Sequence, residues 1–227
     1  PGTVEALERI RHGQIGEPRI FNSILSFQIQ PNNHRLQGSL WGGPLQDLGV
    51  YCINAARHLF EAEPTEVWAS CNERTDNPLF NEVEESIAAT MVFPGGRIAQ
   101  FIASFGADTC DSYTVVGTAG SLTMDPAYRF ESAMRLQQRN QEAMKTDQFP
   151  YTDHFAGMTA YFSECIRNGN PPEADGLEGL ADLAILLAIE KSAQTGELQK
   201  IELPKRSVHP NAEMIYRYPR SEKKILL

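Results

Sequence analysis

The chain has few cysteines, and no motif brings them together. Its four cysteines include no Cys-x-x-Cys pair and have no nearby histidine pair at ligand spacing. A zinc site is therefore not expected, and at 227 residues the chain can bury a sizeable core without disulfides. Cys52 and Cys165 fall on apolar helical stripes, which predicts that both are buried as small hydrophobic residues.

Positive charge and long apolar runs are scarce as well. The 20 Lys and Arg residues are outnumbered by 29 Asp and Glu, giving a formal net charge of −9. This balance disfavours nucleic acid and anionic lipid as partners, because both require a basic surface. The longest apolar run, around 183–189, is too short to span a membrane, and no secretory signal is visible. We therefore expect a cytoplasmic protein that binds a small neutral molecule.

Hydrophobic periodicity predicts helices on either side of a block of strands. Helical spacing covers 3–12 and 44–60, and a β-rich run, 19–30, lies between them. From 66 to 124 apolar residues alternate, and short turns join consecutive strands, which makes those strands antiparallel. Two more helices are expected from apolar stripes that end at Asn168-Gly169 and at Gly196; their members are Phe155, Met158, Phe162, Cys165 and Ile166, then Leu177, Leu180, Ala184, Leu187 and Ala188.

This arrangement predicts an α+β fold. We expect one domain over 1–227, built on a large open, mainly antiparallel sheet with helices packed on one face. A short strand is expected over 198–203. The segment 205–227 is polar and punctuated by proline, so it is predicted to be an irregular tail.

The segment from Gly42 to His58 is the most informative part of the chain. Asp47, Tyr51 and Asn54, followed by His58, are spaced by four, three and four residues, so they share one face of a helix. A carboxylate beside a phenol can handle the proton of a substrate hydroxyl. The solvated side of any amphipathic helix has the same spacing, so the spacing alone leaves both interpretations open.

The whole segment resembles a motif of the Gfo/Idh/MocA oxidoreductases, most of all in their glucose–fructose oxidoreductase and dimeric dihydrodiol dehydrogenase branch. It reads Gly42-Gly43-x-Leu45-x-Asp47-x-Gly49-x-Tyr51-x-x-Asn54-x-x-Arg57. The resemblance continues in the same order over roughly nine tenths of the chain, through Gly13-Gln14-Ile15-Gly16, Val83-Glu84-Glu85-Ser86 and the segment from Gly117 to Pro126.

The resemblance implies the C-terminal half of a two-domain oxidoreductase, with a fold like the C-terminal domain of glyceraldehyde-3-phosphate dehydrogenase. An N-terminal Rossmann domain would bind NAD or NADP, and the free face of the sheet would form a homodimer or homotetramer. Asp47 and Tyr51 take the positions of the catalytic Asp and of the catalytic His or Tyr. Tyr51 would carry the proton and contact the nicotinamide, polarised by a lysine from the other half, while Asp47 orients the substrate.

That cofactor-binding half is expected to be absent from this chain. No Gly-x-Gly-x-x-Gly follows a predicted strand, and the Glu-Lys-Pro motif that supplies the family's lysine is missing. The glycine clusters that do occur have the surroundings of turns. We therefore expect the 227-residue chain alone to be inactive, because none of its own groups can accept a hydride.

Four more residues are predicted to bind the substrate: Arg35 and Trp41 in a polar loop, Asn54 on the motif helix, and His154 at the start of a later helix. Arg35 can donate to hydroxyls and Trp41 can stack on a sugar face, although exposed polar loops are common. A lone histidine is more often structural or solvated, so such a role remains the alternative for His154. Neighbouring Asp153 is interpreted as a helix cap.

The leading hypothesis is therefore the substrate-binding and oligomerisation half of an NAD(P)-dependent oxidoreductase acting on a sugar, cyclitol or diol hydroxyl. The alternative is a non-catalytic oligomerisation or ligand-binding module that uses the exposed sheet face, since both faces of 86–93 and 97–105 carry apolar residues. A glycoside hydrolase is disfavoured, because it needs two converging carboxylates and Asp47 is the only carboxylate that a motif supports as catalytic. Asp182 and Glu190 are interpreted as the solvated face of the last helix.

Overall fold

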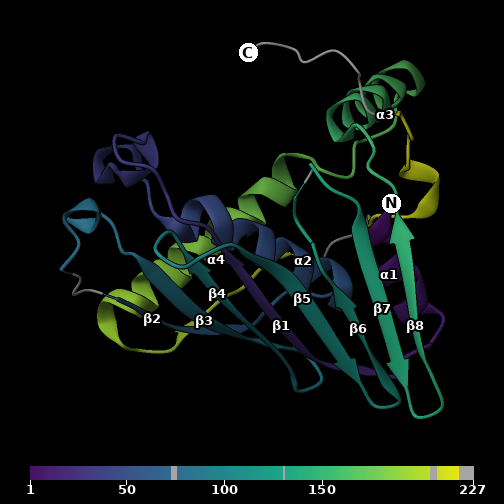
Figure 1. Ribbon diagram of the computed structural model, residues 1–227, viewed down its shortest axis with the longest axis horizontal. Helices are drawn as coiled ribbons and strands as arrows, with labels where there is room; N and C mark the ends of the chain where they lie inside the picture. The colour runs from purple at the N-terminus through teal and green to yellow at the C-terminus, as the bar shows by residue number, and fades with distance from the viewer. Residues whose placement is uncertain (73–75, 130, 205–208, 220–227) are drawn as a thin grey trace.

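A computed structural model describes residues 1–72, 76–129, 131–204 and 209–219 (Figure 1). In this part of the chain the strands are β1 Pro18–Ser26, β2 Glu66–Cys71, β3 Ser86–Phe93, β4 Arg97–Ser104, β5 Cys110–Gly117, β6 Gly120–Met124, β7 Met134–Asn140, β8 Met144–Phe149 and β9 Gln199–Lys200. They form one open sheet in the order β8-β7-β6-β5-β1-β4-β3-β2-β9. Its central pair β1 and β4 is parallel, and the other neighbours are antiparallel. The predicted fold class is confirmed.

The helices are α1 Gly2–Arg11, α2 Val50–Phe60, α3 His154–Asn168 and α4 Gly176–Thr195. α1 packs on β6 and β7, α2 on β1 and β4, and α4 on β2, whereas α3 stands apart from the sheet in Figure 1. Asp153 and Asp175 accept hydrogen bonds from the first backbone N–H groups of α3 and α4, as N-caps do. Gly169 and Gly196 end the two helices in the left-handed conformation that glycine adopts without strain.

The core lies between the sheet and helices α2 and α4. Phe21 of β1, Met91 of β3 and Phe101 of β4 point to the same side of the sheet and are buried there. The apolar stripe predicted for 44–60 meets them, and its members are all buried: Leu45, Leu48, Cys52, Ala55, Ala56 and Leu59. Cys52 and Cys165 are both buried, as predicted.

For α4, the prediction of which side of the helix packs on the sheet is wrong. Leu177, Leu180 and Leu187 are at least half exposed, and the buried side consists of Glu178, Ala181, Ile185, Leu186, Ile189 and Ser192. The helix is apolar on more than one side, so periodicity could not identify the side that meets β2. The apolar face predicted for α3 forms on one side of that helix, but Phe155, Met158, Phe162 and Ile166 are more than half exposed.

The hairpin of β7 and β8 was not predicted. Only Met134 and Leu136 of β7 are buried, and β8 has no buried residue, so the alternation is too weak to recognise in the sequence. Residues 209–219 contain a single short helical turn, Ala212–Met214, while 205–208 and 220–227 of the predicted tail lie outside the described residues. In the described part of the chain no helix is long and apolar enough to cross a membrane.

Candidate active site

The sequence predicts a regular helix over 44–60, but the motif segment does not begin as an α-helix. Its first turn, Leu45–Gly49, is π-helical and leads directly into α2. A Cβ added at Gly49 would lie 3.2 Å from the Phe101 ring and 3.0 Å from the Leu45 side chain. Glycine at this position therefore lets the turn approach β4 closely. Single π-helical turns of this kind are frequent at functional sites.

The glycines of the motif hold the Arg35 loop against this turn. A Cβ at Gly42 would clash with the carbonyl oxygen of Arg35, and the Gly43 N–H donates to that oxygen at 2.9 Å. The loop is thereby placed so that Arg35 Nε donates to Asp47 Oδ1 at 2.6 Å. The structure thus joins two residues to which the sequence assigned separate roles. Both side chains remain partly exposed, so solvent screens their attraction.

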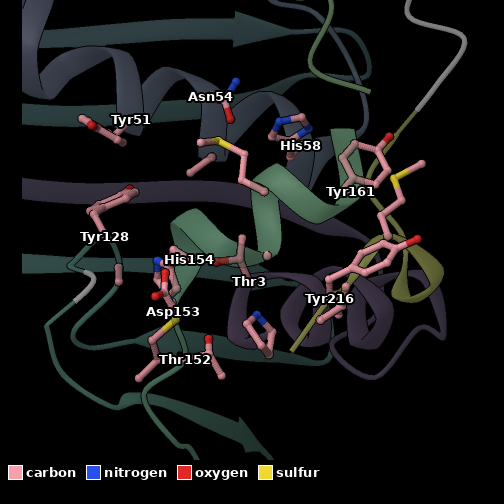
Figure 2. A pocket seen from close by; sticks show the side chains of 18 of the residues that line it. Thr3, Tyr51, Asn54, His58, Tyr128, Thr152, Asp153, His154, Tyr161 and Tyr216 are labelled. Atoms are coloured by element: carbon pink, nitrogen blue, oxygen red, sulfur yellow. The ribbon is translucent and has the colours of Figure 1, made fainter. Parts of the chain in front are cut away.

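A cavity of about 700 Å³ lies beside α2 (Figure 2). Tyr51, Asn54 and His58 line it from α2, and His154 lines it from the start of α3. The three residues from α2 therefore lie on one side of the helix, as their spacing predicts, whereas Asp47, which was expected on the same face, does not line the cavity. Arg35 and Trp41 are also outside the set of described residues that line the cavity. Trp41 instead ends a short helical turn in the polar loop, with its side chain partly exposed.

His154 reaches the cavity because Asp153 fixes the start of α3. Asp153 Oδ1 accepts a hydrogen bond from the backbone N–H of Ala156 at 2.9 Å, which confirms the predicted cap. Burial lowers the pKa of His154, so the imidazole is neutral at pH 7. A neutral imidazole can both donate and accept a hydrogen bond.

Tyr128 is a cavity residue that the sequence analysis missed. Asp111 Oδ1 accepts hydrogen bonds from the backbone N–H groups of Ala127 and Tyr128, at 3.0 and 2.8 Å, and so fixes the loop that follows β6. The Tyr128 ring lies 6.3 Å from that of Tyr51, and its hydroxyl lies 2.8 Å from Ser23 Oγ. Burial raises the pKa of Tyr128 well above its ordinary value, so this phenol stays protonated. No sequence signal marked it, since its position depends on a buried carboxylate from another strand.

Arg57, the last residue of the motif, lies at the centre of a buried ionic network. Its side chain is 0% exposed and pairs with Glu63, Glu178 and Asp182. Burial opposes the charge, but the three carboxylates hold the pKa of Arg57 above its ordinary value. Asp182 is only 14% exposed, so its assignment to a solvated face is wrong. Glu190 is half-buried and lines a separate pocket with Gln194 and Glu84.

Comparison with known proteins identifies the family. The GFO/IDH/MocA C-terminal domain model matches residues 3–123, more than half of the chain. The chain belongs to the Gfo/Idh/MocA family. D-xylose 1-dehydrogenase [NADP(+)] of Haloarcula marismortui is 28% identical over 89% of this chain and 58% of its own length. Trans-1,2-dihydrobenzene-1,2-diol dehydrogenase of Danio rerio is 26% identical over 56% of this chain and 37% of its own.

A solved structure agrees with this assignment. The aldose-aldose oxidoreductase from Caulobacter crescentus, complexed with glycerol, superposes with a TM-score of 0.81 and 31% identity, over 88% of this chain and 60% of its own. This Gfo/Idh/MocA chain thus spans about three fifths of the length of such relatives. Within the described residues, no group of three or more His, Cys, Asp or Glu side chains could hold a metal ion.

Proposed function

We propose that this chain is the substrate-binding and oligomerisation half of an NAD(P)-dependent oxidoreductase that acts on a hydroxyl of a sugar, cyclitol or diol. The observation that carries the proposal is the cavity beside the motif helix, lined by Tyr51, Asn54 and His154. A volume of about 700 Å³ suits a small molecule, and these side chains offer neutral hydrogen-bonding groups that match hydroxyls. The names of the relatives, a xylose dehydrogenase and a diol dehydrogenase, favour such substrates.

In this proposal Tyr51 moves the proton of the reacting hydroxyl. Asp47 and Arg35 pair at the start of the same helix and, like the partly exposed Trp41, do not line the cavity. In this proposal Asp47 and Arg35 orient the part of the substrate that extends beyond the cavity, and Trp41 offers a flat face for a sugar ring there. Tyr51 lines the cavity and is still 53% exposed, which fits a nicotinamide brought to it by another domain. When bound, the nicotinamide would accept a hydride from the alcohol carbon or return one to the carbonyl. We propose NADP first, because the Haloarcula relative is named for NADP(+).

The domain that binds the cofactor is proposed to cover the apolar sides of α3 and α4. Phe155, Phe162 and Ile166 on α3, and Leu177 and Leu180 on α4, are all more than half exposed. Large apolar side chains left exposed on two consecutive helices indicate a covering partner. About two fifths of the length of these relatives lies outside the part that this chain matches, enough to supply that partner.

The activity is tested on the intact protein, by following reduced nicotinamide while NADP⁺ is incubated with D-xylose, myo-inositol or a vicinal diol. We expect hydride transfer from at least one of these alcohols by the intact protein and none by the 227-residue chain alone. If the intact protein transfers no hydride from any of these alcohols to either NADP⁺ or NAD⁺, the result would contradict the proposal and favour the non-catalytic module.

The open face of the sheet is proposed to join a second copy of the chain. Its outward positions on β1, β3, β4 and β5 carry no charged side chain: Ile20, Asn22, Ile24, Ala88, Thr90, Val92, Ile98, Gln100, Ile102, Ser112, Thr114 and Val116. Strand register places Ile20 beside Ile98 and Ile24 beside Ile102, so the four half-exposed isoleucines form two pairs, with the uncharged pair Asn22 and Gln100 between them. Interface cores are depleted of charge in this way, whereas an exposed face is normally charged.

Replacing Ile102 by aspartate is expected to weaken this self-association at least about tenfold, because a two-fold interface would bury the new charge twice. Sedimentation should show a dimer or tetramer for the unmodified chain at micromolar concentration and a shift toward monomer for Ile102→Asp. Leu198→Asp is the matched control, since Leu198 is similarly exposed but lies between α4 and β9. A monomeric unmodified chain, or equal effects of the two variants, would argue against the interface.

A further inference from the structure

Arg57 uses all of its N–H groups inside the fold. Nε and Nη2 donate to the two oxygens of Glu63 at 2.6 and 2.9 Å, and Nη1 and Nη2 donate to the two oxygens of Glu178 at 2.9 Å each. The remaining N–H of Nη1 donates to Asp182 Oδ1. A guanidinium has five N–H donors in a rigid plane, so this cation fixes the positions of the carboxylates around it.

Two of these carboxylates also hold the side chain of Asn54, one helical turn before Arg57. Asn54 Nδ2 donates to Glu178 Oε1 at 2.9 Å and to Asp182 Oδ2 at 3.2 Å. The amide nitrogen has only two hydrogens, and both are used. Rotating the amide by half a turn would place its oxygen against two carboxylates. The network therefore allows one orientation of Asn54.

This orientation leaves the amide oxygen as the remaining polar atom of Asn54. None of the described residues donates a hydrogen bond to Oδ1, and Asn54 lines the cavity together with Asp182. His58 lines it as well and is labelled with Asn54 in Figure 2. A carbonyl oxygen has two lone pairs, so Oδ1 can accept hydrogen bonds from the contents of the cavity. A hydroxyl group is the donor that a sugar or polyol offers.

We propose that Glu178 and Asp182 are positioning residues that orient the Asn54 amide, so that its Oδ1 accepts a hydrogen bond from one hydroxyl of the substrate. This inference rests on the proposed function, because it takes the cavity as the polyol site. It adds a source of specificity, since a polyol that lacks this hydroxyl leaves a fixed acceptor without a donor. Asp182 and Asn54 are 128 positions apart in the sequence, so only the fold brings them together.

Asp182→Asn reverses the hydrogen bonding without changing the size of the side chain. The new amide oxygen must face Arg57, because a guanidinium offers only donors. Its nitrogen then faces Asn54 Nδ2, so two donors meet, and Asn54 loses its single orientation. The variant should still fold, because it removes one of three carboxylates that surround a single cation. Asp182→Ala removes the same acceptor and serves as the second variant.

The test is calorimetric titration of D-xylose and its monodeoxy analogues into the intact protein, which requires no turnover. We expect the unmodified protein to bind one analogue on the order of tenfold more weakly than D-xylose. Asp182→Asn should bind D-xylose as weakly as that analogue, without discriminating between them. Glu190→Gln is the matched control, since it makes the same charge change on the same helix away from this cavity. Retention of the tenfold discrimination in Asp182→Asn and Asp182→Ala would overturn the inference.

A double-mutant cycle separates positioning from direct contact. If Asp182 acts through Asn54, then Asp182→Asn adds no further loss of affinity to Asn54→Ala. Additive losses would mean that Asp182 contacts the sugar itself, which overturns the inference. Failure of the unmodified protein to bind any of the sugars overturns it too. Sugar binding with the predicted discrimination but without hydride transfer would support the inference and contradict the proposed function alone.

Discussion

Replacing Tyr51 by phenylalanine in the intact protein is expected to lower kcat by roughly 10²- to 10⁴-fold, the usual contribution of a positioned proton carrier. The ring is kept, so its packing beside Tyr128 at 6.3 Å should persist. Only the hydroxyl that would exchange a proton with the substrate is removed. KM for the sugar and the affinity for the cofactor should change little. Steady-state kinetics with NADP⁺ and D-xylose, together with equilibrium cofactor binding, measure these quantities.

Two other tyrosines serve as comparisons for this experiment. Tyr218 is also partly exposed but lies outside the residues that line the cavity, so Tyr218→Phe should leave kcat unchanged. Tyr128→Phe removes a hydroxyl from the same cavity, one that burial keeps protonated, and should cost less than Tyr51→Phe. A larger loss in Tyr128→Phe would assign the proton transfer to Tyr128, and unchanged turnover in Tyr51→Phe would remove Tyr51 from the mechanism.

The parts of the fold that depend on local periodicity could be predicted from the sequence. The stripe that contains Leu48, Cys52 and Leu59 repeats at helical spacing, and each of these residues is buried against the sheet. The alternation in 86–93 and 97–105 likewise predicted strands, and β3 and β4 each bury alternate residues in the core. Periodicity is enough in these cases, because one face of each element meets the core and the other does not.

Long-range partners could not be predicted in the same way. Asp182 lies at a polar position of a helix that is apolar on several sides, and its ion pair with Arg57 joins segments 125 residues apart. Asp111, which fixes the loop of Tyr128, is a single carboxylate within a strand. Arg35 and Asp47 illustrate an intermediate case, since both were identified as candidates but their ion pair depends on how Gly42 and Gly43 fold the loop.

Replacing Arg57 by methionine is expected to lower the free energy of unfolding by about 3–5 kcal/mol at neutral pH, because removing one partner leaves buried charges uncompensated. Glu63, Glu178 and Asp182 would then surround an apolar side chain that is fully buried in the native fold. Methionine approximates the length of the arginine stem, so the lost interaction is mainly ionic. Urea unfolding of the 227-residue chain, followed by the fluorescence of its tryptophans, measures the difference.

The pH dependence of this loss distinguishes unpaired charge from a packing defect. Burial raises the pKa of Asp182 even with Arg57 present, and without the cation its folded-state pKa should rise further above the unfolded value. A carboxyl group with a raised folded-state pKa favours the fold at low pH, and this contribution is lost as the pH rises through the folded-state pKa. The loss of unfolding free energy in Arg57→Met should therefore become smaller as the pH falls, whereas the loss from a packing defect would be independent of pH. If the variant is unfolded at neutral pH, it should recover structure in mild acid.

Arg11→Met is the matched control for this prediction. Arg11 also pairs with two carboxylates, those of Glu8 and Glu61, but its side chain is 25% exposed and its partners are more exposed still. Ion pairs at the surface contribute little, so we expect a loss below about 1 kcal/mol and little dependence on pH. Equal losses of unfolding free energy for Arg11→Met and Arg57→Met would contradict the prediction. They would mean that burial does not increase the contribution of the Arg57 ion pairs to stability. A larger and pH-dependent loss at Arg57 would instead show that the loss comes from the buried carboxylates that Arg57 neutralises, two of which also accept hydrogen bonds from Asn54.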